Sequence, residues 1–464
     1  MFLPLTAVAF VAWMALPVGA LSATVPAPHR PVAQAGLPWL SVHDQRIVDE
    51  SGRRVLLRGF NDSALIASSP DVSPLDEVDA RIMQASGFDV VRLPVVWSAL
   101  EPSRGQFDHA YLSRLAAAAS MLNSHGMYVV FDMHFLGWSP EYGGAGAPAW
   151  ATVPGVPDAH WGPMPSISRL LSPAINFSTA YFWLAGDWQD EFLRTWQLVA
   201  TSFRDDSGIA GYDIINEPHS FPLPPFRFDK DQMWPFYAKA VQALGAADPN
   251  HLFFLDNDMA GDIPTTVVPL SAPDLVYAPH VYTGALIPPY FTGDTGPLSE
   301  HVRELAGEAA SVPAALWFGE FSININTPHS AGWVNAVLDA FDDHNAGWAW
   351  WQWRQDGGWG VRSADGRSID TDFLKLLARP YIVAAPSGVS SDHGDGQRGR
   401  LRISVSPDHA DVPLVVAWPA YTQGIAYVTS TCGASSHYDA TSSRIEILLP
   451  VSSGCELTVS SGRA

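Results

Sequence analysis

The 464-residue sequence has few cysteines, few basic residues and little charge overall. Its two cysteines, Cys432 and Cys455, form no Cys-x-x-Cys motif, so a zinc or thiol-redox centre has little support. Only 26 residues are Lys or Arg against 47 Asp or Glu, which gives a net charge of −21. A chain this acidic is repelled by phosphate backbones, so we expect no nucleic-acid partner. With 47% hydrophobic and 16% charged residues, the composition predicts a folded protein with a sizeable core.

Beyond the N-terminus, the sequence contains no apolar run long enough to cross a membrane. The N-terminus itself has an apolar stretch from Leu5 to Leu16, followed by small residues that include Ala20 and Ala23. This pattern is typical of a secretory signal peptide, although no Lys or Arg precedes the stretch; a membrane anchor is the alternative. We therefore predict a signal peptide over residues 1–23, a linker over 24–38, and secretion. In a secreted protein the two cysteines most simply form a disulfide.

No Gly-x-Gly-x-x-Gly motif follows the first predicted strand, so a dinucleotide-binding fold has no support. Instead, strand patterns alternate with helical patterns along most of the chain. The predicted strands are Val55–Phe60, Asp89–Leu93, Tyr128–Asp132, Tyr212–Ile215, His251–Leu255, Leu275–Ala278, Ala315–Gly319 and Trp348–Trp353. Eight strands in this alternation predict an α/β fold, a (β/α)8 TIM barrel over residues 39–378.

The pattern changes near Arg379-Pro380. From there to the C-terminus, short alternating runs such as Leu401–Val405 and Arg444–Leu448 are separated by Ser, Gly and Asp turns. This is typical of a small antiparallel β-sandwich, which we predict over residues 379–464. The two cysteines fall within it. We expect a mainly structural role for this domain, packed on the barrel.

Polar and aromatic side chains follow the predicted barrel strands, where the catalytic groups of a barrel enzyme project. These residues are Arg92, His134, Asn216, Glu217, His280, Tyr282, Glu320 and Trp351. Two of them are carboxylates, and glycoside hydrolysis needs such a pair: one protonates the leaving oxygen and the other attacks the anomeric carbon. A single Glu after a strand is more often a surface charge or a helix cap. Two Glu residues that each follow a predicted strand, grouped with Asn, His, Tyr and Trp residues, favour a catalytic site.

The segment Ile214-Ile215-Asn216-Glu217-Pro218 resembles the Asn-Glu-Pro signature of glycoside hydrolase family 5, and the resemblance extends over about residues 40–378. It implies that Glu320 is the nucleophile, held as a carboxylate by Arg92 and Tyr282, and that Glu217 is the acid/base. It also implies that Asn216 holds the sugar 2-hydroxyl and that Trp351 stacks under the first sugar, with Trp350 and Trp353 as alternatives. Arg92, His134, His280 and Tyr282 complete the expected substrate-binding set. No metal or organic cofactor is expected.

Within that family, the sequence is most similar to endoglycoceramidases, which release the glycan of a glycosphingolipid from its ceramide. The resemblance rests on Phe131-Asp132-Met133-His134, on a C-terminal sandwich that begins near Arg379-Pro380-Tyr381, and on long apolar segments near the site. One segment runs from His134 to about Asp187 and the other covers Leu286–Phe291. They could line a groove for lipid tails or simply pack as a lid. The implied substrate is a glycosphingolipid, helped by detergent or an activator at a membrane surface, and we expect a monomer.

One position departs from the endoglycoceramidase pattern. His134 is followed by Phe135 and Leu136, where those enzymes carry Gln and an Asp that contacts the first sugar. This difference leaves both glucose and galactose open at that position, the latter as in endogalactosylceramidase-type relatives. Two other functions stay open. One is an endo-β-glucanase or other polysaccharide-directed family 5 hydrolase, and the other is a non-catalytic protein that binds glycans or glycolipids.

Overall fold

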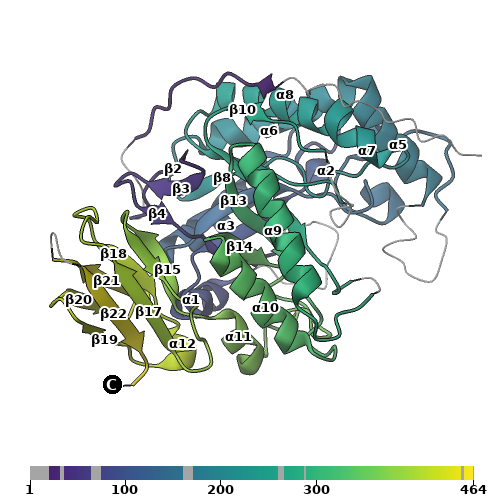
Figure 1. Ribbon diagram of the computed structural model, residues 1–464. Coiled ribbons are helices and arrows are strands. Elements are labelled where there is room, and N and C mark those ends of the chain that lie inside the picture. Colours follow the sequence, from purple (N-terminus) through teal and green to yellow (C-terminus); the bar gives the residue numbers. More distant parts are fainter. Residues whose placement is uncertain are drawn as a thin grey trace, which may run out of the picture.

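The computed structural model describes residues 20–31, 36–63, 75–159, 171–259, 266–286, 289–450 and 454–462. It consists of a barrel flanked on one side by a smaller body of antiparallel sheets, coloured yellow-green in Figure 1. Most of the predicted signal peptide, residues 1–19, lies outside the described residues. In the part of the chain that is described, no helix has the length and apolar character needed to cross a membrane.

The barrel is a closed ring of parallel strands, as the sequence predicted. Each strand pairs with the next, and β14 pairs with β5, while β11 pairs with both β9 and β13 and so closes the ring. The sixth strand is divided into β11 and β12. The strands are β5 (Arg58–Asn61), β6 (Val90–Val95), β7 (Tyr128–Met133), β8 (Ile209–Asp213), β9 (Leu252–Leu255), β11 (Leu275–Tyr277), β12 (His280–Val281), β13 (Ala315–Phe321) and β14 (Gly347–Trp350).

Helices surround the barrel and alternate with its strands, as the sequence predicted (Figure 1). Asp side chains cap the N-termini of several of them; for example, Asp108 accepts hydrogen bonds from the first-turn amides of α3. The helices that follow barrel strands are α1 (Glu77–Ala85), α2 (Trp97–Leu100), α3 (His109–Ser124), α6 (Asp187–Phe203), α7 (Pro225–Phe228), the π-helical turn η3 (Asp229–Met233), α8 (Trp234–Ala247), α9 (Gly296–Ser311), α10 (Ser330–Asp343) and α11 (Thr371–Leu377).

Alternate residues of the barrel strands belong to two separate apolar clusters. Val90, Val130 and Phe254 pack with one another inside the ring. Their neighbours, such as Val91 and Phe131, pack outward against the helices. The period of two continues beyond the last paired residue of a strand, so every second side chain there points toward the barrel axis. This alternation positions the side chains of the site.

The long segment after β7 contains more structure than the apolar loop we predicted. It holds the 3-10 turns η1 (Pro140–Tyr142) and η2 (Ala149–Ala151) and an additional helix, α5 (Pro173–Ala185). Gly186 lies between α5 and α6 with a φ of 83°, a conformation that favours glycine. Several of its apolar residues, including Phe135, Trp138 and Phe182, are buried. Of the aromatic residues that the sequence places there, Trp161 lies outside the described residues.

The sandwich consists of a seven-stranded and a four-stranded antiparallel sheet. The seven-stranded sheet includes three strands from near the N-terminus, because β4 pairs with β15. Residues 40–55, which lie within the range predicted for the barrel, thus supply three strands of a sandwich sheet, and the first predicted strand, Val55–Phe60, is divided between β4 and β5. The strands are β2 (Leu40–His43), β3 (Arg46–Asp49), β4 (Arg54–Val55), β15 (Tyr381–Ala385), β16 (Val389–Ser391), β17 (Arg400–Val405), β18 (Leu414–Ala417), β19 (Tyr427–Ser430), β20 (Ser435–Asp439), β21 (Arg444–Leu448) and β22 (Cys455–Ser460), with the short helix α12 (Ala420–Gln423).

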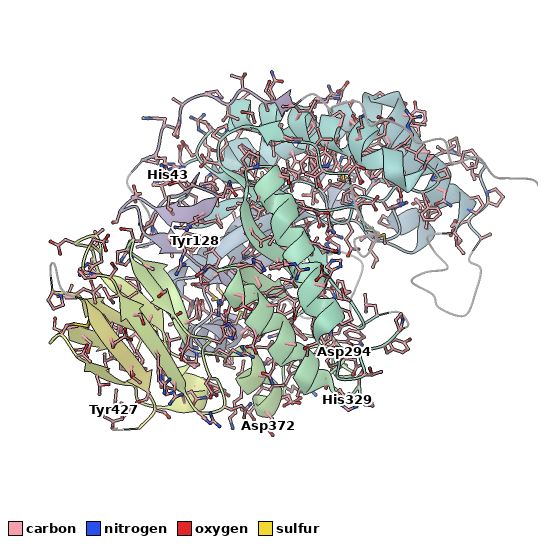
Figure 2. All side chains as sticks on the ribbon, in the orientation of Figure 1. His43, Tyr128, Asp294, His329, Asp372 and Tyr427 are labelled. Atoms are coloured by element: carbon pink, nitrogen blue, oxygen red, sulfur yellow. A yellow bond between two sulfur atoms is a disulfide. The ribbon has the colours of Figure 1, made fainter. Side chains whose placement is uncertain are left out.

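The predicted disulfide between Cys432 and Cys455 is present and joins the segment after β19 to β22. Polar contacts connect the sandwich to the end of the barrel where the strands begin. The Tyr381 hydroxyl donates to the Gly87 carbonyl at 3.1 Å, and Arg444 lies 3.7 Å from the buried Asp89. Figure 2 shows Tyr128 at this end of β7, where its hydroxyl donates to the Pro38 carbonyl at 2.7 Å. The sandwich is thus remote from the rim where the strands end.

The described part of the N-terminus packs on the outside of the barrel. Strand β1 (Leu21–Ser22) pairs in parallel with β10 (Leu270–Ser271). Ala23 is buried in the outer apolar cluster. The last residues of the predicted signal peptide therefore form part of the folded body.

Candidate active site

All eight residues predicted from the strand ends gather at one rim of the barrel. Arg92 lies within β6, and His134, Asn216 and Glu217 follow β7 and β8. The others come from β12, β13 and the residue after β14. Because every barrel strand is parallel, these carboxyl ends meet at one face.

The Glu217 and Glu320 carboxylates face each other at the centre of this rim. Their nearest oxygen atoms, together with a His280 ring nitrogen, lie within 4.8 Å of one another. The Glu320 side chain is 5% exposed and that of Glu217 is 23% exposed. A separation this short is typical of retaining glycosidases, whose carboxyl groups lie about 5–5.5 Å apart, whereas inverting enzymes need about 6.5–9.5 Å to admit a water molecule.

Arg92 is completely buried and holds the polar groups beneath the site. Its guanidinium contacts Glu320 Oε1 at 2.7 Å, Asp213 Oδ2 at 2.8 Å, Asp132 Oδ1 at 3.0 Å, Asn216 Oδ1 at 3.0 Å and Asn61 Oδ1 at 3.1 Å. A buried guanidinium is favourable only when its donors are satisfied in this way. Although burial opposes the charge, the surrounding carboxylates raise the pKa of Arg92 well above its ordinary value. The site therefore has a fixed positive charge under Glu320.

Tyr282 contacts the other oxygen of the Glu320 carboxylate. Its hydroxyl donates to Glu320 Oε2 at 3.0 Å. Burial, followed by the charges of Glu320 and Glu217, raises the pKa of Tyr282 well above its usual value. The residue therefore stays a phenol and a hydrogen-bond donor. Arg92 and Tyr282 thus hold Glu320 in one orientation.

His134 and Trp351 form a stacked pair at the edge of the site. Their ring centroids are 5.2 Å apart and their planes differ by 7°. His134 Nδ1 lies 2.7 Å from Asp132 Oδ2, and this carboxylate raises the pKa of His134 although burial opposes it. Trp350 and Trp353 are fully buried in the core, so of the three tryptophans only Trp351 has a face available to a ligand.

His280 is a neutral imidazole between several carboxyl groups. Its Nδ1 lies 3.0 Å from Glu217 Oε1 and 3.7 Å from Glu320 Oε2, and its Nε2 lies 3.2 Å from Asp256 Oδ2. Burial lowers the pKa of His280 to about 3. Burial also raises the pKa of Glu217 above its ordinary value, which favours the acid form that a proton donor needs.

The predicted site residues omit four buried members of this network: Asn61, Asp132, Asp213 and Asp256. Burial raises the pKa of Asp213 to about 7 and that of Asp256 well above its usual range. For Asp256 a signal was available, because it extends the inward series Leu252 and Phe254 of β9 by one more step of two. We predicted the fourth strand at Tyr212–Ile215, whereas β8 is Ile209–Asp213, so the prediction makes Asp213 an interior strand residue and not a strand end.

Glu217, His280 and Glu320 are close enough together to ligate a cation. The Arg92 guanidinium lies 2.7 Å from Glu320, however, and its charge opposes a metal ion there. We therefore assign no metal to this group.

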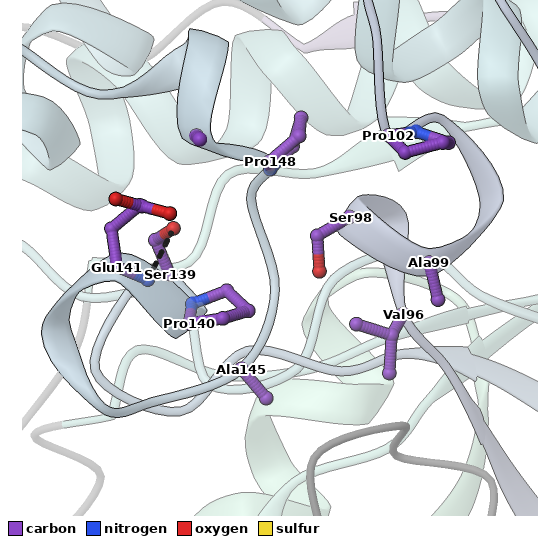
Figure 3. A pocket seen from close by; sticks show the side chains of 10 residues that line it. Val96, Ser98, Ala99, Pro102, Ser139, Pro140, Glu141, Ala145 and Pro148 are labelled. Carbon is purple, nitrogen blue, oxygen red and sulfur yellow. Dashed lines mark hydrogen bonds between the residues drawn. The ribbon is translucent and has the colours of Figure 1, made fainter.

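A hollow of about 330 Å³ lies between the segments that follow β6 and β7 (Figure 3). Its lining is mostly proline and alanine, with polar groups from Ser98, Ser139 and Glu141. None of the eight predicted site residues lines it.

A family model, Cellulase (glycosyl hydrolase family 5), matches residues 48–357, a span that contains every one of these site residues. The chain belongs to glycosyl hydrolase family 5. The family 5 enzyme is 30% identical over 441 residues to endoglycoceramidase I of Rhodococcus hoagii (strain 103S), a match that covers 85% of this chain and 84% of the relative. The expected membership of the endoglycoceramidase group is thereby confirmed.

Two solved structures share the fold of the enzyme over nearly its whole length. The ganglioside GM3 complex of endo-glycoceramidase II from Rhodococcus sp. has a TM-score of 0.78 at 22% identity, covering 91% of this chain and all of that one. A structure of endogalactoceramidase has a TM-score of 0.76 at 28% identity, with the same coverage. The family 5 barrel with its C-terminal sandwich is therefore the fold of this enzyme.

Proposed function

We propose that the enzyme hydrolyses the β-glycosidic bond between the glycan and the ceramide of glycosphingolipids by double displacement. The observation that carries the lipid part is the location of exposed apolar side chains. Twelve large hydrophobic residues are exposed among those described, and eight of them follow the carboxyl ends of β7, β8 and β12. These eight are Leu136, Leu171, Phe177, Tyr181, Leu184, Phe221, Leu286 and Tyr290. The exposed apolar side chains are thus concentrated in the segments that follow the strand ends of the catalytic rim.

Helix α5 illustrates this distribution. Phe177, Tyr181 and Leu184 are spaced by four and three residues, so they lie on one face of the helix. They are 59%, 40% and 61% exposed. A polysaccharide can stack its sugar rings on Phe177 or Tyr181 but gains little from Leu184, whereas an acyl or sphingoid chain gains about 25 cal/mol per Å² of apolar surface buried against the whole face.

The catalytic groups suit a two-step reaction. In the first step Glu320 attacks the anomeric carbon while Glu217 gives its proton to the ceramide oxygen, so the glycosidic bond breaks and a glycosyl–Glu320 ester forms. In the second step Glu217, now a carboxylate, takes a proton from water, and that water cleaves the ester to release the glycan. The retaining separation of the two carboxylates supports this mechanism over single displacement.

The substrate-binding roles follow from the same geometry. Asn216 is held between Arg92 and the Phe135 carbonyl, to which its amide donates at 3.0 Å, a position suited to the 2-hydroxyl of the reacting sugar. Trp351 has the available aromatic face for the first sugar. A relative 30% identical over most of the chain carries the name endoglycoceramidase I, which supports the ceramide leaving group.

We also propose that the protein is secreted. Cys432–Cys455 is a disulfide, and such bonds persist in oxidising compartments. Cleavage after Ala23, the end of the predicted signal peptide, removes the β1–β10 pairing, whereas cleavage after Ala20, another small residue of that segment, retains it.

The test compares a ceramide-linked glycan with the same glycan on a short alkyl group, using both glucose and galactose as the first sugar. We expect kcat/KM to be much higher for the ceramide form in mixed micelles. Phe177→Ser and Leu184→Ser should reduce this preference. Leu448→Ser is the matched control, because Leu448 is equally exposed but lies on the sandwich strand β21. Equal rates on the two substrates, or higher activity on a soluble β-glucan, would refute the ceramide assignment.

A further inference from the structure

Asp256 follows the carboxyl end of β9 and lies next to the Glu217 backbone and His280. Its side chain is completely buried. It does not belong to the strand-end set from which the reaction was argued, and it has no contact that the two-step mechanism uses. Asp256 nevertheless contacts the backbone amide of Glu217, and it contacts His280, which in turn contacts the Glu217 carboxyl group.

The first contact is to the backbone of Glu217. Glu217 adopts a left-handed conformation with a φ of 43°, which is uncommon for a residue other than glycine and persists only where the surroundings hold it. Its amide donates to Asp256 Oδ2 at 2.8 Å. The next residue is braced as well, because the Pro218 carbonyl accepts from the Met259 amide at 2.9 Å. The segment after β9 therefore holds the turn that presents Glu217.

The second contact reaches the carboxyl group of Glu217 through His280. The same Asp256 oxygen lies 3.2 Å from His280 Nε2, while His280 Nδ1 lies 3.0 Å from Glu217 Oε1. Nε2 makes no hydrogen bond with the described residues, so Asp256 acts on the ring by close contact and charge, while Nδ1 on the other side of the ring hydrogen-bonds Glu217. One buried oxygen thus acts on the backbone of Glu217 directly and on its carboxyl group through a ring.

We propose that Asp256 is a positioning residue for Glu217: it fixes the left-handed turn that aims the side chain and orients His280 against its carboxyl group. The assignment rests on the proposed acid/base role of Glu217. The other oxygen of Asp256 accepts from the Asn257 amide at 2.8 Å, which fixes the plane of the carboxyl group. Asp256 therefore acts on proton donation to the leaving group and not on nucleophilic attack.

This role predicts a loss that depends on the leaving group. Asp256→Asn keeps the size of the side chain, but its amide nitrogen replaces one carboxyl oxygen and so faces either the Glu217 N–H together with His280 or the Asn257 N–H. We expect kcat/KM for a ceramide- or alkyl-linked glycan to fall by about 100-fold, because a misaligned general acid forfeits most of its contribution. For the 2,4-dinitrophenyl glycoside of the same glycan, whose leaving group needs no proton, kcat/KM should fall less than about threefold. This parameter reports only the steps up to bond cleavage, so the later hydrolysis step does not interfere.

Two further variants make the result decisive. Glu217→Gln should show the same selectivity with a larger loss; an equal loss on both substrates there would overturn the acid/base assignment and the inference with it. Asp248→Asn is the matched control, because Asp248 forms a buried pair with His251 at 2.6 Å near the start of β9. It should lower the melting temperature without selectivity between the substrates.

If Glu217→Gln is selective but Asp256→Asn affects both substrates equally, or neither, the proposal for Asp256 is wrong. Should Asp256→Asn fail to fold, His280→Gln interrupts the same connection to the Glu217 carboxyl group. Because His280 also lies near Glu320, some loss is expected on both substrates, but the loss should be larger on the alkyl-linked glycan; a loss no larger there than on the dinitrophenyl glycoside would overturn the proposal.

Discussion

Arg92 Nη1 lies 2.7 Å from Glu320 Oε1, and neither residue is more than 5% exposed at its side chain. The guanidinium is shared with Asp132 and Asp213, so it cannot follow Glu320 when that side chain moves. The carboxylate is therefore held in place before substrate arrives, and its other oxygen is fixed by Tyr282. Pre-organisation of this kind is what a nucleophile needs, since little reorganisation then accompanies attack.

Glu320→Gln should abolish turnover and leave the fold intact. The amide keeps the shape of the side chain but cannot attack the anomeric carbon, so we expect kcat to fall by roughly 10⁴-fold or more. Thermal denaturation checks the fold, and calorimetry with intact glycolipid checks binding. A variant with near-normal kcat would show that another group is the nucleophile.

The pH dependence of kcat/KM should report Glu217. Burial raises the pKa of Glu217, so the acid form persists to higher pH than an ordinary glutamic acid allows. Activity should accordingly fall as the pH rises through that pKa, because the proton for the leaving oxygen is lost. The measurement is a profile on an alkyl-linked glycan, repeated with Glu217→Gln. In that variant the alkaline decline should disappear; if it persists, a different residue is the proton donor.

Trp351→Ala and Trp350→Ala should separate binding from stability. Trp351 is partly exposed beside His134, and its loss should raise KM by about 10-fold through lost stacking while the melting temperature stays nearly unchanged. Trp350 is fully buried, and its removal should cost about 3–5 kcal/mol of unfolding free energy. Denaturant titrations and steady-state kinetics on both variants check this. The reverse pattern would place the sugar platform on Trp350.

Asp89, at the contact between barrel and sandwich, should make stability pH-dependent. Burial raises the pKa of Asp89 to about 6, so between about pH 4 and pH 6 the folded state retains a proton that the unfolded state has released. The free energy of unfolding should therefore fall as the pH rises through that window. In Asp89→Asn this decline should be smaller by roughly 1–3 kcal/mol, as measured by urea denaturation at both pH values. Identical pH profiles for the two proteins would contradict it.

The strand ends were predictable because a parallel barrel brings every carboxyl end to one rim. A clear apolar run ends at or just before each of four site residues: Arg92, His134, Glu217 and Glu320. The apolar pattern of a strand does not show which other strand it pairs with, however. Strands β2 to β4 have ordinary alternation, and nothing local indicates that β4 pairs with β15, some 330 positions along the chain.

The sequence analysis did not predict helix α5, and here the cause was the composition of the helix and not a distant pairing partner. Its residues are mainly apolar on all sides, because Ile175 and Phe182 pack inward while Phe177 and Leu184 remain exposed. Such a helix has little of the alternation between polar and apolar faces on which helix prediction rests. In our proposal the exposed apolar side chains bind lipid. Because they take the place of polar residues on the outer face, the sequence lacks the amphipathic pattern that predicts a helix.

The pairing of β4 with β15 also has a consequence for how the chain is made. Strand β4 immediately precedes the first barrel strand, yet its partner is synthesised only after the last one. During synthesis the edge of β4 therefore lacks its partner until the whole barrel sequence has left the ribosome. Contacts of such high sequence separation form slowly, and an open strand edge invites pairing with other chains. A truncated chain that stops after the barrel would keep that edge permanently, so aggregation rather than lost catalysis is the expected result of removing the sandwich.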